Sequence, residues 1–266
     1  MNTHDVFNRA ASYEPYVGRW SRLLAPMFLD WLGVAPGCTW LDVGCGTGAL
    51  TDSILASAEP AAVAGIDPSM EFVAHATEAI VDPRAAFTVS DAMNLDFPDG
   101  VFDAAASALV LNFVPDARRA VAEMRRVVRP AGTVGGYVWD YAAGMRMMRI
   151  FWDAAVELDP TAAELDEGVR FKLCTPEALR ACFESSGLDA VEVRALDCPM
   201  VFADFDDYWT PFLGGQAPAP AYAMSIGKDR RDGLRDLIRS RLPIEDDGGI
   251  RLVSRAWAVK GTAKRR

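Results

Sequence analysis

Histidine is scarce in this sequence, and its cysteines are unpaired. The chain has 266 residues but only two histidines, His4 and His75, which lie far apart and away from any cysteine cluster. The five cysteines form no CxxC pair and are odd in number. Zinc and haem sites are usually built from such clusters, and disulfide frameworks from even numbers of cysteines. We therefore expect no metal site, and reduced thiols in a reducing compartment.

Long apolar runs and an excess of positive charge are also absent. No run of about 18 apolar residues occurs, so we expect no membrane span. The N-terminal stretch MNTHDVFNRAASYEPYVGRW lacks the basic start and apolar centre of a secretory signal, and we expect a cytoplasmic protein. The formal charge of −10 argues against nucleic acid as a partner, because that contact needs Lys and Arg to neutralise phosphates.

Short apolar runs alternate with helical stretches in the first half of the chain. Strands are expected at residues 39–44, 61–67, 85–91, within 102–111 and at 133–140, and helices at 49–58, 69–80 and 116–128. An alternation of strand and helix at these lengths is typical of βαβ units, hence of a parallel sheet covered on both faces. In the N-terminal segment, Pro26 is expected to interrupt a helix or to start a new one.

The second half follows a different pattern. A helix is expected at residues 174–188, with Pro176 in its first turn and Gly187 past its end. Alternating strands are expected at 189–196 and 250–261. The segment between them, 197–249, is too long for a plain hairpin connection and is interpreted as an insertion folded over one end of the sheet.

The stretch TWLDVGCGTGAL places Gly44, Gly46 and Gly48 between a strand and a helix. Open α/β sheets bind ligands at the carboxyl ends of their strands, and glycines let the backbone approach a ligand closely. A tight turn that binds nothing is the alternative, but a turn needs only one glycine. The run also satisfies GxGxxA, an allowed dinucleotide pattern, so two cofactors remain open: a dinucleotide and S-adenosylmethionine.

Acidic residues and the chain's ending favour S-adenosylmethionine. Asp42 stands just before the glycines, where it would repel a pyrophosphate but attract the ammonium and sulfonium groups. Asp67 ends the second strand and suits the ribose of either cofactor. Asp91 ends the third strand and could accept a hydrogen bond from the adenine amino group, or else cap a helix. An antiparallel last strand also fits a methyltransferase sheet.

Four stretches resemble, in order and spacing, the motifs of class I S-adenosylmethionine-dependent methyltransferases, most closely the group with ubiquinone and menaquinone C-methyltransferases and many small-molecule methyltransferases. They are LDVGCGTGAL, GIDPS, VSDAMNLDFPDGVFDAAASALVLNFVPD and RVVRPAGTVGGYVWD. The resemblance implies an α/β fold: a doubly wound, mostly parallel seven-stranded sheet, the Rossmann-like methyltransferase fold, with an antiparallel last strand and a helical cap. We expect a single domain over 1–266, with an N-terminal helical lid (1–36), a cofactor-binding half (37–140) and a substrate-side cap (141–174 and 197–249).

The same resemblance implies the cofactor site. The glycines would pass under the methionine part, which Tyr16 and Arg19 would hold by its carboxylate. Met70 would pack on the adenine or in a helix core, and Ser107, just after the fourth strand, would lie beside the methyl group. The expected cofactor-binding residues are Tyr16, Arg19, Asp42, Gly44, Cys45, Gly46, Gly48, Asp67, Pro68, Ser69, Met70, Asp91, Ala92, Met93 and Ser107. One departure concerns turn geometry: Ala131 stands where the family usually has a second glycine.

Methyl transfer does not require a general base, because the sulfonium is already a good leaving group. The catalytic candidates are Asp140 as a base or helix cap, Tyr141, and Asn112, which could orient an acceptor but not act as a base. Trp209 and Phe212 are hypothesised to face a small, partly apolar acceptor. Tyr13 and Trp20 either line the pocket or pack on the sheet.

The sequence thus predicts a methyltransferase that acts on a small molecule by direct displacement. Two alternatives stay open: an NAD(P)-dependent oxidoreductase, and a catalytically silent S-adenosylmethionine-binding protein.

Overall fold

A computed structural model describes residues 14–215 and 217–264 and shows a seven-stranded sheet with the order β3-β2-β1-β4-β5-β7-β6. The strands are β1 (Thr39–Val43), β2 (Ala62–Asp67), β3 (Ala85–Val89), β4 (Phe102–Ala108), β5 (Val128–Trp139), β6 (Leu188–Phe202) and β7 (Ile250–Ala263). The first five pair in parallel, and β7 runs antiparallel to both of its neighbours. The predicted fold, with its antiparallel last strand, is confirmed.

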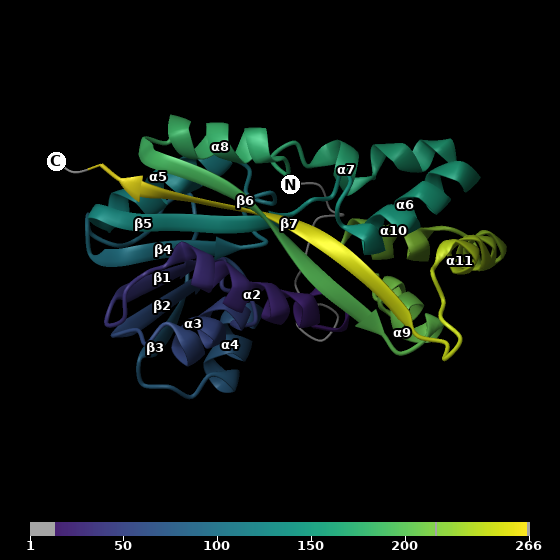
Figure 1. The fold of residues 1–266 in the computed structure, drawn as a ribbon, viewed down its shortest axis with the longest axis horizontal. Coiled ribbons are helices and arrows are strands. Elements are labelled where there is room, and N and C mark those ends of the chain that lie inside the picture. The colour runs from purple at the N-terminus through teal and green to yellow at the C-terminus, as the bar shows by residue number, and fades with distance from the viewer. Residues whose placement is uncertain (1–13, 216, 265–266) are drawn as a thin grey trace.

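Helices cover both faces of the sheet. The helices α2 (Arg19–Leu32), α3 (Ala49–Ser57) and α4 (Met70–Ala79) lie on one face, and α5 (Ala117–Val127) and α8 (Pro176–Ser185) lie on the other (Figure 1). Their starts follow from local chemistry: Ser69, Asp116 and Thr175 each accept a hydrogen bond from a backbone N–H in the first turn of α4, α5 and α8.

The last two strands are longer than the sequence pattern predicted. They pair from Leu188 with Ala263 to Phe202 with Ile250, and they continue past the sheet as a two-stranded ribbon (Figure 1). Residues 197–202 were assigned to the insertion, and this is wrong. Burial alternates through Cys198, Met200 and Phe202, all fully buried, so these residues belong to β6. The proline at 199 obscured that pattern.

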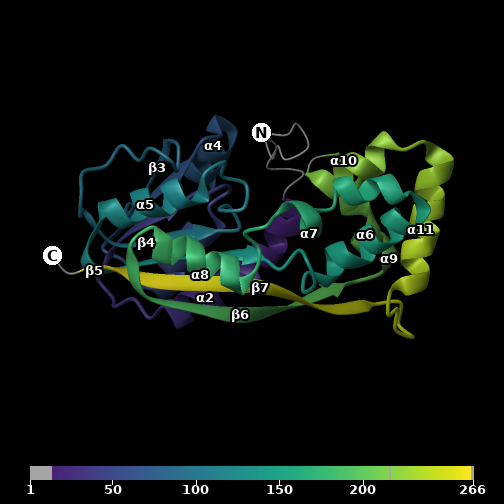
Figure 2. The same ribbon diagram turned by 90° about the horizontal axis from the view of Figure 1, so that it is seen from above.

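The remaining helices after β5 are α6 (Arg146–Leu158), η3 (Pro160–Glu164), α7 (Glu167–Arg170), α9 (Phe205–Trp209), η4 (Thr210–Leu213), α10 (Pro218–Ser225) and α11 (Lys228–Arg241). They lie beyond the covered part of the sheet, and α6, α9, α10 and α11 gather at the far end of this ribbon (Figure 2). We call these remaining helices the cap. Among the described residues, no helix combines the length and apolar character needed to cross a membrane.

The helix α2 contradicts the expectation for Pro26. A short π-helix, η2 (Glu14–Gly18), precedes it, and α2 then runs without interruption past the proline. Proline removes one backbone donor, but Leu24, Ala25 and Phe28 are fully buried around it. This packing holds the helix together across the missing hydrogen bond.

Candidate functional site

The loop between β1 and α3 contains three glycines, and each of them has a positive φ: +76° at Gly44, +53° at Gly46 and +90° at Gly48. An added Cβ would lie 2.6 Å from the Val110 side chain at Gly44, and 2.5 Å from Ile80 at Gly48. At Gly46 it would meet no heavy atom within 4 Å. Two of the glycines are therefore required by packing, whereas Gly46 faces open space large enough for a ligand to approach its backbone.

Asp42 lies behind this loop with its side chain completely buried. Its Oδ2 accepts a hydrogen bond of 2.7 Å from Thr51 Oγ1, whereas its Oδ1 is buried without a partner. Burial raises the pKa of Asp42 to about 7, against the lowering effect of the bonds from Thr51. A cation near Oδ1 would compensate this carboxylate, and a phosphate would not.

Asp67 ends β2 beside the same loop. Its Oδ2 accepts a hydrogen bond of 3.1 Å from Gly46 N, and its Oδ1 accepts one of 2.8 Å from Ser69 N. Burial raises the pKa of Asp67 above its ordinary value. The contact between Asp67 and Gly46 joins the ends of two neighbouring strands into one cradle. Cys45, within the loop, is buried, and Pro68, which follows Asp67, is exposed.

Met70 opens α4 with 76% of its surface exposed, so its alternative role as a helix core residue is wrong. An exposed thioether at the first position of this helix is available to cover an apolar ring. The packing of Met70 on adenine stays a prediction.

The connection that leaves β3 carries the expected adenine residues. Asp91 is exposed, and its Oδ1 accepts a hydrogen bond of 2.9 Å from Met93 N. No helix follows, so the alternative of a helix cap is wrong, and Asp91 instead stabilises a turn. Ala92 is buried, and Met93 is half-buried.

Ser107 does not follow the fourth strand, as expected, but lies inside it. It is fully buried, and its Oγ donates a hydrogen bond of 2.8 Å to the carbonyl of Val43. Ser107 therefore ties the end of β1 to β4, immediately beneath the glycine loop.

Tyr16 and Arg19 contact the cap and the ribbon. The Tyr16 hydroxyl donates to Met148 Sδ at 3.1 Å, and its ring meets Phe212 edge-on at 5.6 Å. Arg19 pairs with Asp207 at 2.8 Å. Tyr16 is thus packed against the cap, and its contact with the methionine carboxylate stays a prediction. Arg19 is paired, but its Nε and Nη2 are buried without a partner and remain able to donate.

Trp20 is buried and meets Phe202 edge-on at 5.2 Å, in agreement with its packing role. The companion prediction for Tyr13 lies outside the described residues.

Asn112 follows β4, and both its amide nitrogen and its amide oxygen are buried without a partner. Leu109, three residues before it, has a φ of +61°, a costly conformation for a leucine. A strained turn that buries an unsatisfied amide is typical of a site completed by a ligand.

The two catalytic candidates after β5 are both buried. Asp140 Oδ1 accepts a hydrogen bond of 3.1 Å from Ala143 N, so it caps a turn and not the helix α6, whose N-cap residue is Met145. The ring of Tyr141 meets Phe171 edge-on at 5.3 Å.

Phe212 is completely buried and stacks on Phe151 at 4.6 Å, while Trp209 is 5% exposed and stacks on Phe205. The hypothesis that Phe212 faces an acceptor is therefore wrong, because this ring fills the interior of the cap. Trp209 is almost as deeply packed.

Sequence reasoning missed a buried carboxylate in the cap. Glu167 is 2% exposed and accepts a hydrogen bond from Trp152 Nε1, and burial raises its pKa to about 8. No local pattern marks it, since its environment is made by α6. Among the described residues, no group of three or more His, Cys, Asp or Glu side chains is placed to hold a metal ion.

Comparison with known proteins finds a family match within the first half of the chain. Residues 41–135 match the family model described as a methyltransferase domain. A 2-methyl-6-phytyl-1,4-hydroquinone methyltransferase from Synechocystis sp. is 34% identical over 184 residues, which cover 68% of this chain and 56% of the relative. A demethylmenaquinone methyltransferase from Lysinibacillus sphaericus is 31% identical, over 50% of this chain and 56% of the relative. The chain thus spans about half the length of these curated relatives.

Solved structures agree on the fold. A phosphoethanolamine N-methyltransferase 2 from Haemonchus contortus, in complex with S-adenosylhomocysteine, superposes with a TM-score of 0.60 at 19% identity. The match covers 96% of this chain and 57% of that one.

Proposed function

Since the chain belongs to the class I methyltransferases, we propose that it binds S-adenosylmethionine and transfers a methyl group to a small molecule. The observation that carries this proposal is Asp42, whose unpartnered Oδ1 lies buried behind a glycine loop open at Gly46. A positively charged ligand would satisfy this oxygen. The pyrophosphate of a dinucleotide would be repelled by it, which disfavours the oxidoreductase alternative.

The residues present fit this cofactor. Gly44, Gly46 and Gly48 would lie under its methionine part, and Asp67 would accept the ribose hydroxyls. Asp91, Ala92 and Met93 would meet the adenine edge, with Met70 over its face. The part of the chain from 37 to 140 would thus hold the cofactor, residues 1–36 would close over it, and the cap would hold the acceptor.

When bound, S-adenosylmethionine supplies a methyl group activated by its sulfonium. The chain's contribution is then to align the acceptor with that group and to exclude water. We propose that the Asn112 amide orients the acceptor, because it is buried with free donors and acceptors. Asp140 is the candidate for removing a proton where the acceptor requires it, and Tyr141 lines the same turn after β5.

The acceptor is proposed to be a small molecule with an apolar body. The names of two relatives support this, since they specify a prenylated hydroquinone and demethylmenaquinone.

Two measurements test the proposal in sequence. Calorimetric titration of the protein with S-adenosylhomocysteine and, separately, with NAD(H) should detect binding of the first only; the opposite result would overturn the proposal. The protein is then incubated with methyl-labelled S-adenosylmethionine and pooled small metabolites that include hydroquinones. Label in the organic extract is expected, and binding without any label would indicate a silent binder.

A matched pair of variants makes the first measurement specific. Asp42→Asn removes the buried charge and should weaken binding. Asp52→Asn makes the same change on α3, at a side chain that is 62% exposed, and should leave affinity unchanged.

A further inference from the structure

The crossover between β3 and β4, residues 90–101, contains no helix or strand and only one isolated bridge, between Asp91 and Asn94. Its apolar side chains anchor it: Ala92 and Leu95 are buried, and Phe97 meets Phe102 edge-on at 5.0 Å. A segment without regular structure must find other partners for its backbone N–H and C=O groups.

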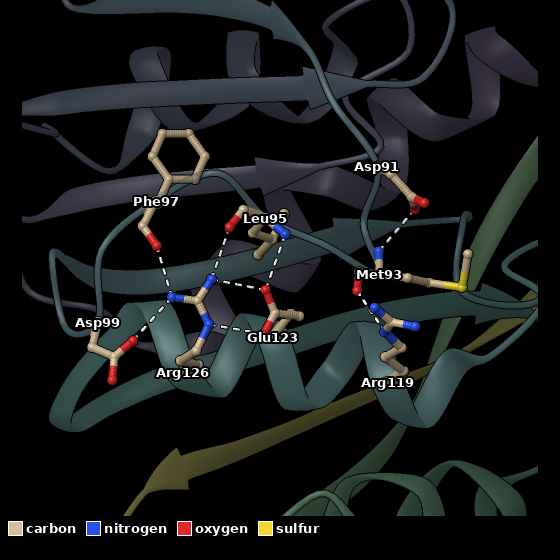
Figure 3. Close-up of polar contacts among 8 residues, drawn as sticks. All are labelled: Asp91, Met93, Leu95, Phe97, Asp99, Arg119, Glu123 and Arg126. Atoms are coloured by element: carbon tan, nitrogen blue, oxygen red, sulfur yellow. Dashed lines mark hydrogen bonds and ion pairs between the residues drawn. The ribbon is translucent and has the colours of Figure 1, made fainter.

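These partners come from one face of α5, as Figure 3 shows. Arg119 Nε donates to the Met93 carbonyl at 2.8 Å. Arg126 donates from Nη2 to the Leu95 carbonyl at 2.8 Å and from Nη1 to the Phe97 carbonyl at 2.7 Å. Glu123 Oε2 accepts from Leu95 N at 3.0 Å. Met93, Leu95 and Phe97, which are alternate residues of the crossover, are thus held in place by side chains on one face of α5.

The side chains of Arg126 and Glu123 form a preorganised pair. Arg126 and Glu123 make a two-bonded ion pair with both distances at 2.8 Å, and Asp99 accepts a further bond of 3.0 Å from Arg126. Arg126 also holds the pKa of Glu123 below its ordinary value. A guanidinium whose orientation is set by a forked pair presents its remaining donors at fixed positions. We call Arg119, Glu123 and Arg126 the α5 clamp.

The clamp is connected directly to Asp91. Arg119 binds the carbonyl of Met93, and the N–H of the same residue donates to Asp91 Oδ1 at 2.9 Å. The exposed carboxylate of Asp91 is therefore hydrogen-bonded to the residue whose carbonyl α5 holds in place (Figure 3).

We propose that the α5 clamp consists of positioning residues that set the recognition of the cofactor's base. It holds residues 91–95 so that Asp91 and the Ala92 backbone face the edge of an adenine. This inference rests on the proposed function, and it assigns selectivity among purines to side chains of α5 that act through the backbone of the crossover.

The test compares two ligands that differ only at the base. S-inosylhomocysteine carries a carbonyl where S-adenosylhomocysteine carries the amino group, so the ratio of their dissociation constants measures recognition of that edge. We expect the wild-type protein to prefer the adenosyl compound. In Arg126→Lys, which cannot make the forked pair, this preference should fall about tenfold, the equivalent of one good hydrogen bond.

Arg129→Lys is the matched control. Arg129 also pairs with a carboxylate, Asp103, and donates to the carbonyl of Val101, but it does so at the start of β4. It should keep the wild-type ratio. Arg119→Gln, a milder change at the Met93 carbonyl, provides an independent test if Arg126→Lys folds poorly, and should lower the ratio in the same direction.

The outcomes separate the two proposals. If the wild-type protein binds neither ligand, the proposed function fails. If it discriminates between them and both clamp variants lose only thermal stability while keeping the ratio, the clamp is a structural brace and this inference is overturned. The double variant that combines Arg126→Lys with Asp91→Ala should lose no more of the preference for the adenosyl compound than Asp91→Ala alone.

Discussion

Thr51 Oγ1 donates a hydrogen bond of 2.7 Å to Asp42 Oδ2, and this bond satisfies only half of a completely buried carboxylate. The other oxygen, Oδ1, has no partner. A buried carboxyl in this condition prefers to be protonated, which explains why burial raises its pKa to about 7. The Asp42 site is therefore completed either by a proton or by a cation.

The first prediction concerns the pH dependence of stability. The Asp42 carboxyl titrates near 3.9 when unfolded and near 7 when folded, so the folded state holds the extra proton between these values. The free energy of unfolding should therefore fall as pH rises through this window, by about 2–4 kcal/mol. In Asp42→Asn, urea denaturation at a series of pH values should show a flatter profile. Part of the slope will persist, since Glu167 has a pKa raised to about 8.

Asp67→Ala is predicted to weaken the binding of S-adenosylhomocysteine by about 2–4 kcal/mol, because the ribose hydroxyls would lose their acceptor. Calorimetric titration measures this directly. Asp67 also accepts hydrogen bonds from Gly46 N and Ser69 N, so the thermal midpoint is followed in parallel. Asp103→Ala, which removes a carboxylate at the opposite end of the sheet, is the control for stability alone. Unchanged affinity in Asp67→Ala would remove this residue from the site.

The parts of the fold that were predictable depend on local signals. Period and turn chemistry along residues 39–140 placed five strands and three helices, and two of these helices begin after a side chain that accepts a hydrogen bond from the first turn, Ser69 and Asp116. The glycine loop was recognisable because glycine adopts a positive φ at no steric cost, whereas other residues rarely do. The proposal that this loop holds the cofactor rests on the strand before it and on the acidic residues around it.

What could not be predicted depends on distant contacts. The partner of Arg19 is Asp207, which lies 188 positions away along the chain. Tyr16 is buried because Met148 and Phe212 surround it. The α5 clamp could not be seen for the same reason, because its acceptors are backbone carbonyls that leave no trace in the residue pattern.

Phe212→Ala should destabilise the protein by about 3–5 kcal/mol, since it removes a fully buried ring stacked on Phe151. Urea denaturation of the variant measures the loss. The neighbouring change Leu213→Ala, at a side chain that is 40% exposed, should have a much smaller effect. A change in acceptor preference with unchanged stability would instead restore the hypothesis that Phe212 faces the acceptor.

A substitution at Ala131 is predicted to increase the stability of the protein, whereas Phe212→Ala lowers it. The φ of +66° at Ala131 lies in the left-handed region, which suits the glycine that the family usually has there. Ala131→Gly should therefore stabilise the protein by about 0.5–1 kcal/mol. The control is Ala122→Gly in the middle of α5, which should destabilise by about 1 kcal/mol. If both variants lost the same amount of stability, the positive φ at Ala131 would carry no net strain in the folded protein.

Asn112 leads to the last prediction, in which stability and activity should move in opposite directions. Both polar atoms of its amide are buried without a partner, and such a group costs about 1–3 kcal/mol. Asn112→Leu, which keeps the number and branching of the side-chain heavy atoms but has no polar atom, should thus raise the free energy of unfolding by about 1 kcal/mol and lower the rate of methyl transfer. Asn112→Asp, which buries a charge in the same space, should lower both. If Asn112→Leu is destabilising instead, the amide already has partners in the folded protein and is not held available for an acceptor.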